Sequence, residues 1–200
     1  MSNRADELIK FMKESGRIIR FSDILDAGFH PDTIKHLLDQ NRIIRPARGL
    51  YALEDNMPKE HPDLVLANIQ APGGVICLIS ALSFYNATSD IPSRVDIALE
   101  KGAGEYRINY PPVKYYHFSS KSYSAGISMH QIEGYRVKIY NLAKTIADCF
   151  KFRNQIGIDT ATEGLKIAVT EHNINPNKIM EYARICRVHN IIKPKLETLI

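Results

Sequence analysis

Residues 25–53, LDAGFHPDTIKHLLDQNRIIRPARGLYAL, decide how the N-terminal part of the chain folds. Gly28 is a residue type that commonly ends a helix, and Pro31 suits the first position of the next helix. From Pro31 to Gln40 the apolar residues recur at helical spacing. Two short helices joined by a turn that contains glycine follow the helix-turn-helix plan.

A β-hairpin is predicted directly after the second of these helices. Ile43 and Ile44 are β-branched residues that favour a strand. Residues 46–49 begin with proline and end with glycine, as turns often do, and residues 50–53 supply the returning strand. A hairpin in this place makes the motif a winged helix-turn-helix. Its wing is basic, because no acidic residue lies between Asn41 and Leu53 and three arginines do: Arg42, Arg45 and Arg48.

The chain upstream of this motif is predicted to add one more helix. Residues 3–15 carry an apolar stripe bordered by charged side chains and are followed by Gly16. Ser22 is then expected to cap the short helix SDILDA, which stops at Gly28. Three helices and the hairpin together make up residues 1–55.

A winged helix-turn-helix binds DNA through its third helix and its wing. The N-terminal half of the third helix would lie in the major groove, where polar side chains reach base edges and phosphates. The residues expected there are His30, Asp32, Thr33, Lys35 and His36. The arginines of the wing would contact phosphates or enter the minor groove. Two alternatives stay open: the arginines form a solvated edge on a protein-interaction domain, and Asp32 is an acid favoured by the helix dipole.

Composition limits what the whole chain can be. Its 200 residues are 44% apolar and 24% charged, which is typical of a folded protein with one medium domain or two small ones and excludes a disordered chain. The formal charge of +4 is too small to indicate nucleic-acid binding by itself. Residues 1–55 hold nine of the 26 basic and nine of the 22 acidic side chains, so the positive surplus belongs to residues 56–200.

Cysteine usage and hydropathy favour a cytoplasmic protein without a cofactor. The three cysteines, Cys77, Cys149 and Cys186, lie far apart in sequence, which argues against a zinc cluster and against a disulfide framework. The N-terminus lacks the apolar core of a secretory leader, and no stretch approaches the roughly 20 apolar residues of a membrane span. We therefore expect the reducing cytoplasm, no membrane contact, and no bound metal or cofactor.

The remainder of the chain is predicted to form an α+β domain. Residues 54–62 are polar, contain two prolines and are typical of a linker, so we place the domains at 1–55 and 56–200. The predicted elements are strands at 94–101, 113–118, 127–132 and 135–140, and helices capped by Asn141, Asp159 and Asn175. The expected fold class is therefore α+β: an N-terminal winged helix-turn-helix followed by a mixed sheet with C-terminal helices.

Three blocks of the sequence together resemble one protein family. Residues 25–53 look like the N-terminal winged-helix domain of AbiEi-type antitoxins. The positions that match the family pattern there are Gly28, Leu37 and the Arg48-Gly49-x-Tyr51 wing. ISALSFYNATSDIPSRVDIALEKG at 79–102 and YNLAKTIADCFKFRNQIGIDTATEGLKIAV at 140–169 resemble the second domain of the same family. The three blocks occur in the family's order and cover most of the chain.

The resemblance implies a role for each part of the chain. It implies the antitoxin of a type IV toxin–antitoxin system, whose second domain opposes a cognate nucleotidyltransferase-like toxin. It also implies a transcriptional repressor whose winged helix binds double-stranded promoter DNA of its own operon. The alternative from a different functional class is a stand-alone winged-helix regulator whose second domain senses a ligand or a partner protein.

Two stretches of the second domain carry five basic residues for one acidic residue. The first lies between Gly134 and Arg153 and the second between Lys178 and Lys195. If they converge in space, they form a basic surface that suits DNA phosphates or an acidic partner protein. The residues predicted for this surface are Arg136, Lys138, Lys144, Lys151, Arg153, Lys178, Arg184 and Arg187. The alternative is that each stretch is an ordinary solvated face.

No catalytic site is predicted. The nearest enzyme pattern is a metal-dependent nuclease, for which Asp96, Glu100 and Lys101 offer the residue types. Glu100 and Lys101 are adjacent on a predicted strand and would point to opposite faces, so the spacing does not fit. Thr145 and Asp148, nearly one turn apart on a predicted helix, are expected to form a structural hydrogen-bonding pair.

Overall fold

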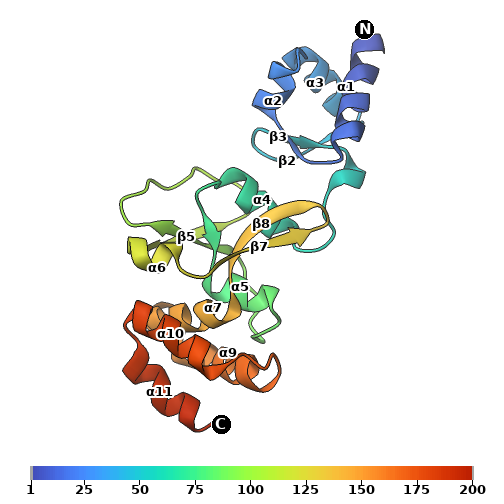
Figure 1. Cartoon of the computed structure of the whole chain (residues 1–200). Helices are drawn as coiled ribbons and strands as arrows, with labels where there is room; N and C mark the ends of the chain where they lie inside the picture. The colour runs from blue at the N-terminus through green and yellow to red at the C-terminus, as the bar shows by residue number, and fades with distance from the viewer. Residues whose placement is uncertain (1, 200) are drawn as a thin grey trace.

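The computed structural model describes residues 2–199 and has an elongated shape (Figure 1). A helical lobe with a small sheet holds the N-terminus, a second sheet occupies the middle, and the last helices lie at the opposite end with the C-terminus. Within residues 2–199, no helix combines the length and the apolar character that crossing a membrane requires.

The N-terminal lobe is a winged helix-turn-helix, as predicted. Its elements are α1 (Ser2–Ser15), β1 (Ile19–Arg20), α2 (Phe21–Asp26), α3 (Pro31–Asp39), β2 (Ile44–Ala47) and β3 (Leu50–Ala52). The three strands form an antiparallel sheet in the order β1-β3-β2. Leu8, Met12, Ile24, Ile34 and Leu37 are fully or almost fully buried in the core between the helices.

Local chemistry explains where these helices begin and end. Gly28 has a φ of +85°, a conformation that glycine adopts without steric cost, and it separates α2 from α3. Pro31 occupies the first turn of α3, and the His30 ring accepts a hydrogen bond from the Asp32 amide at 3.3 Å. The prediction that Ser22 caps α2 is wrong, because the helix already begins at Phe21 and the Ser22 hydroxyl donates to the side chain of Asp23.

The second part of the chain is built around a mixed five-stranded sheet. Its first elements are the 3₁₀ helix η1 (Glu54–Asn56), α4 (Pro62–Gln70), β4 (Val75–Ile76), α5 (Leu78–Phe84), β5 (Val95–Glu100), β6 (Val113–Phe118) and α6 (Ser120–Ser124). They are followed by β7 (Ile127–Ile132), β8 (Tyr135–Tyr140), α7 (Leu142–Lys151), α8 (Arg153–Ile156), α9 (Ile158–Thr170), α10 (Pro176–Cys186) and α11 (His189–Glu197). The strand order is β6-β5-β4-β8-β7, with β5 parallel to β6 and β4 parallel to β8. The predicted α+β class is confirmed.

Two of the three predicted helix caps are present. The Asn141 side chain accepts from the Lys144 amide at 2.9 Å, and the Asn175 side chain accepts from the Asn177 amide at 2.9 Å. Asp159 is not a cap, because α9 begins one residue earlier, directly after Gly157. Gly157 has a φ of +93°, so the turn at glycine sets the start of α9.

The winged sheet and the large sheet share a hydrophobic core. Ile18, Ala47 and Leu50 of the N-terminal lobe belong to the same buried cluster as Val137 and Ile139 of β8. A second cluster on the helical side of the large sheet joins it to α7, α9, α10 and α11. The N-terminal lobe is thus packed onto the rest of the molecule through its wing, while α1 and α3 lie on its outer side (Figure 1).

Candidate nucleic-acid interface

The residues predicted to read DNA from α3 lie at the surface of the N-terminal lobe. His30, Asp32, Lys35 and His36 are exposed and Thr33 is half-buried. His30 and Asp32 also interact with each other at the start of α3. The His30 Nδ1 atom accepts a hydrogen bond from the Asp32 amide and lies 3.2 Å from the Asp32 carboxylate. Lys35 and His36 therefore project from α3 without a role in starting the helix.

A hollow of about 240 Å³ lies between α1 and the N-terminal half of α3. It is lined by Arg4, Ala5, Asp32, Thr33 and His36. The Arg4 guanidinium lies 6.0 Å from the centre of the Phe29 ring, so this arginine of α1 borders the face that α3 presents. Arg4 is a candidate contact that the sequence did not predict, because Glu7 follows three residues later and balances its charge. In the structure the Arg4 guanidinium lies 3.0 Å from the Glu7 carboxylate.

The three arginines of the wing have three different surroundings. Arg42 pairs with Asp6 of α1 at 2.8 Å, so its charge is balanced within the lobe. The Arg45 guanidinium lies 5.9 Å from the centre of the Tyr51 ring. Arg48 precedes Gly49 in the tight turn between β2 and β3, at the edge of a hollow that the lobe shares with the rest of the chain. The predicted turn over residues 46–49 is shorter in the structure, because β2 extends to Ala47.

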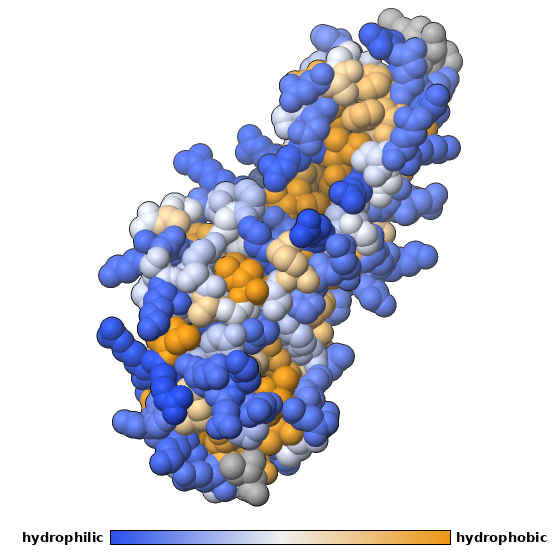
Figure 2. Space-filling model, in the orientation of Figure 1, coloured by the Kyte–Doolittle hydropathy of each residue, from blue (hydrophilic) through white to orange (hydrophobic). Residues whose placement is uncertain are grey.

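We call this shared hollow the basic groove. It consists of two adjoining cavities of about 310 and 410 Å³ that have Arg20 and Ile69 in common. Its charged side chains are Arg17, Arg20, Arg48, Arg107, Arg136 and Lys138, against the single acid Asp23. In Figure 2, the N-terminal lobe stands out from the main body and hydrophilic side chains border the junction.

Backbone carbonyls of α4 and of the turn after it hold two of the cations in place. The Arg20 guanidinium donates to the carbonyl of Ile69, and the Lys138 ammonium donates to the carbonyl of Pro72 at 2.6 Å. Carbonyls near a helix C-terminus favour cations but do not cancel their charge. The groove therefore presents fixed, largely unbalanced positive charge, which attracts anionic groups such as DNA phosphates.

Comparison with known proteins agrees with this picture of the N-terminal lobe. Residues 6–53 match the family model of the AbiEi antitoxins, described as transcriptional regulators. The matched residues all lie in the N-terminal lobe. No curated protein matches the chain. The crystal structure of the RV2827C protein from Mycobacterium tuberculosis is similar, with a TM-score of 0.62 over 98% of this chain and 81% of that one. At 12% identity, this likeness concerns the fold alone.

The AbiEi-type lobe and the second part contribute to the groove in ways that local sequence patterns do not reveal. Arg17 and Arg20 stand alone in a short stretch before α2, and Arg107 lies in the loop between β5 and β6. Arg136 and Lys138 were predicted as basic surface residues, and they line the groove. Only the packing of the wing against α4 and β8 brings these distant residues together.

The prediction that Lys144 belongs to a basic surface is wrong, because this lysine is buried. Its side chain is 0% exposed, and its Nζ atom lies 2.5 and 2.6 Å from the carboxylate oxygens of Asp148. The ammonium also lies 4.1 Å from the centre of the Tyr140 ring and 4.9 Å from that of Phe118. Burial raises the pKa of the Asp148 carboxyl, and the charge of Lys144 opposes this effect.

The prediction that Thr145 and Asp148 form a hydrogen-bonding pair is wrong, because each of these buried side chains has other partners. The Thr145 hydroxyl donates to the carbonyl of Tyr140 at 3.2 Å, and Asp148 accepts from Lys144 and from the Cys186 thiol at 3.2 Å. Burial raises the pKa of the Cys186 thiol to about 12, so it stays protonated and can donate.

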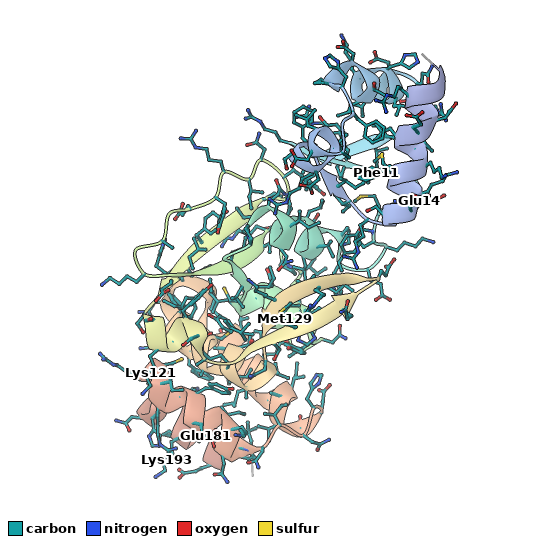
Figure 3. All side chains as sticks on the ribbon, turned by 45° about the horizontal axis from the view of Figure 1, so that its top comes forward. Phe11, Glu14, Lys121, Met129, Glu181 and Lys193 are labelled. Atoms are coloured by element: carbon teal, nitrogen blue, oxygen red, sulfur yellow. The ribbon has the colours of Figure 1, made fainter. Side chains whose placement is uncertain are left out.

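The other basic residues predicted for the second part do not line the basic groove. Lys151 packs over the Phe118 and Phe152 rings, and Arg153 donates to the carbonyl of Phe150 at 2.9 Å, so both are half-buried near the end of α7. The remaining predicted residues, Lys178, Arg184 and Arg187, are exposed on or directly after α10. They lie at the end of the molecule away from the AbiEi-type lobe, as the labels of Glu181 and Phe11 in Figure 3 make clear.

The residues considered for a nuclease are not arranged around a cation. The Asp96 side chain is 3% exposed and lies 3.5 Å from the Arg94 guanidinium, while Glu100 is exposed and accepts from Ser120. Lys101 lies in the turn that follows β5 and not on the strand. In the described part of the chain, no three His, Cys, Asp or Glu side chains are grouped as a metal site would need.

Proposed function

We propose that the chain is a cytoplasmic antitoxin of a type IV toxin–antitoxin system and represses its own operon by binding promoter DNA. The observation that carries the proposal is the basic groove, which continues from the wing turn of an AbiEi-type lobe onto the second part of the chain. Residues 1–55 would recognise the promoter, and residues 56–200 would oppose a nucleotidyltransferase-like toxin.

The proposed DNA contacts fall into two classes. His30, directly before α3, and Asp32, Thr33, Lys35 and His36 of α3 would face bases and phosphates of the major groove. Arg45 and Arg48 of the wing, together with the basic groove, would contact phosphates and so set the position of the duplex without reading its sequence. Arg42 would contribute less, because Asp6 already balances its charge.

Binding to promoter duplex over a salt series tests the DNA-binding half. Each phosphate contact contributes about −0.9 to the slope of log affinity against log salt. Replacing Arg48, Arg107 and Arg136 by alanine should therefore make the slope less negative by up to about 2.7. The matched control replaces three exposed cations of the C-terminal helices, Lys178, Arg184 and Lys193, and should leave the slope unchanged. Equal slopes for the two variants would contradict the groove assignment.

Rescue of growth-arrested cells tests the antitoxin half. The toxin to use is the nucleotidyltransferase-like protein that we expect to be encoded next to this chain. The full-length variant of the C-terminal helices should lose rescue and keep DNA affinity, because its three exposed cations belong to the part that we propose opposes the toxin and do not line the basic groove. The groove variant should keep rescue and lose DNA affinity. A groove variant that loses both properties would contradict this division of labour.

The second candidate function is a stand-alone regulator that senses a ligand, and one feature favours it. A cavity of about 200 Å³ is lined by Asp96, Arg94 and Asp90, and the buried Oδ1 atom of Asp96 accepts no hydrogen bond there, although it lies 3.5 Å from the Arg94 guanidinium. The neighbouring reading frame separates the two candidates. A toxin-like gene there supports the antitoxin, and its absence supports the regulator.

A further inference from the structure

The strand β7 forms an edge of the large sheet and is open on one side. It pairs with β8 in an unbroken register from Ile127 opposite Tyr140 to Ile132 opposite Tyr135. No strand among residues 2–199 pairs with its other side, which leaves backbone N–H and C=O groups directed outward. Natural sheets usually protect such an edge, because it can pair with a strand of another chain.

The opposite edge of the same sheet, β6, is protected in the usual ways. Pro111 and Pro112 precede it and Lys114 lies on it. The preceding loop packs over one face of this strand, where the Tyr115 hydroxyl donates to the carbonyl of Tyr106 at 2.9 Å. The β7 sequence, ISMHQI, contains no charged residue and no proline, and its pairing with β8 has no bulge. The two edges thus differ in proline and in charge, and neither strand has a bulge.

Apolar side chains are exposed on this unprotected strand. Ile127 is 37% exposed and Met129 is 48% exposed, and both lie on the same face because they are two residues apart. Figure 3 labels Met129 on this hairpin, away from the helices at the two ends of the molecule. An edge strand without charges and with exposed apolar side chains favours pairing with another β-strand over exposure to solvent.

We propose that β7 pairs antiparallel with β7 of a second copy of this chain, with Met129 on the two-fold axis. The outward backbone groups require an extended strand as partner, and an uncharged strand pairs with itself without placing like charges opposite each other. In an antiparallel pair around this axis, Met129 lies opposite Met129 and Ile127 lies opposite Gln131, each on the same face as its partner. The symmetric pair uses up both edges, so assembly stops at two chains.

The geometry of this dimer links it to the proposed function, on which the following step rests. A two-fold axis that relates antiparallel edge strands runs perpendicular to the sheet, so equivalent faces of both copies point to the same side. Arg136 and Lys138 lie on the face that carries Met129, since Met129 is paired with Lys138 and Gln131 with Arg136. Both copies would therefore direct these groove residues to one side, as a dimer that binds two half-sites on one duplex requires.

A cysteine on the proposed axis tests the pairing directly. Opposed residues of antiparallel strands have Cα atoms about 4.5–5.5 Å apart, which is within the range that a disulfide spans. Under mild oxidation, Met129→Cys should give a covalent dimer of the full chain. The control is His117→Cys, which places an exposed cysteine on the protected edge β6 and should not cross-link. The three native cysteines are buried and give little background.

Light scattering on the full chain at micromolar concentration gives the second readout. The unmodified chain should have the mass of a dimer. Met129→Lys should have the mass of a monomer and keep the circular dichroism spectrum of the folded chain, because Met129 is half-exposed. A monomeric unmodified chain, or a dimer that persists in Met129→Lys, would overturn the proposal. A dimer through β7 that fails to bind promoter DNA would leave the pairing intact and refute the proposed function instead.

Discussion

Arg42 and Arg48 are both arginines of the predicted wing, but their removal should affect stability and DNA binding differently. Arg42→Ala breaks an exposed ion pair with Asp6 and should lower the free energy of unfolding by no more than about 1 kcal/mol, with little change in the salt slope of DNA binding. Arg48→Ala should leave stability unchanged and make the slope less negative by about 0.9. Denaturant titration and a salt series measure both effects; a larger slope change for Arg42→Ala would contradict the assignment.

Asp96 should make stability depend on pH. Burial raises the pKa of its carboxyl, and Arg94 only partly opposes this effect. The folded protein therefore keeps this proton to higher pH than the unfolded chain, and stability falls as pH rises from about 3.8 through the raised pKa. Asp96→Asn should accordingly melt higher than the unmodified chain at pH 7.

The pH dependence of that difference distinguishes titration from a packing effect. The gain in melting temperature for Asp96→Asn should shrink as the pH approaches 3.8, where the carboxyl of the unmodified chain is protonated in the folded state. Asp55→Asn, at an exposed position of η1, serves as the control and should show no such trend. A gain that is the same at both pH values would point to packing alone.

Single residues also mark how far the sequence could predict the candidate site. The wing arginines could be predicted, because a run of basic residues without acids is visible in any local window. Lys144 could not, because long charged side chains are mostly exposed and its burial depends on rings from β6 and β8. Arg17, Arg20 and Arg107 could not either, because tertiary packing alone joins them.

At the scale of elements, α7 depends on a fully buried ion pair. Lys144→Ala would leave the Asp148 carboxylate buried without its cation, which should lower the free energy of unfolding by about 3–5 kcal/mol. The double variant Lys144→Met/Asp148→Leu removes both charges and should recover much of that loss. Urea denaturation measures the three free energies. As a matched control, Lys178→Ala breaks the exposed pair with Glu181 and should change the free energy of unfolding far less. An equal loss in both single variants would contradict the role of burial.

The elements that the sequence predicted best are those with their own local signals. The hairpin of β7 and β8 turns at Glu133 and Gly134, both of which have positive φ, as a tight hairpin turn needs. Short elements such as β4 and α8 have no periodic pattern, and contacts with the rest of the fold determine them. The same reason explains the shift of the α2 start from Ser22 to Phe21, where the amide of Phe21 donates to the carbonyl of Gly49 in the wing.

For the whole molecule, sequence and structure differ at the boundary between the two parts: the sequence predicts a linker there, and the structure shows that the two parts pack against each other. The polar segment at 54–62 suggests a linker, and the short helix η1 does separate the wing from α4. Packing nevertheless continues across it, because the Tyr135 hydroxyl accepts from the Ile18 amide and donates to the carbonyl of Asn56, each at 2.8 Å. A polar segment in the sequence predicts that the chain is exposed there, but it does not predict which distant residues pack around it.

This shared core predicts that the two parts unfold together. Residues 1–55 alone would expose Ile18, Ala47 and Leu50, which are buried against β8 in the full chain. The isolated segment should therefore melt at a lower temperature than the full chain, which should show a single transition. Tyr135→Phe removes the hydroxyl that satisfies the Ile18 amide and should lower the free energy of unfolding by about 1–3 kcal/mol. Tyr110→Phe, at an exposed tyrosine, is the matched control. If residues 1–55 melt as high as the full chain, the wing does not depend on this interface, and each lobe can be tested for DNA binding and rescue separately.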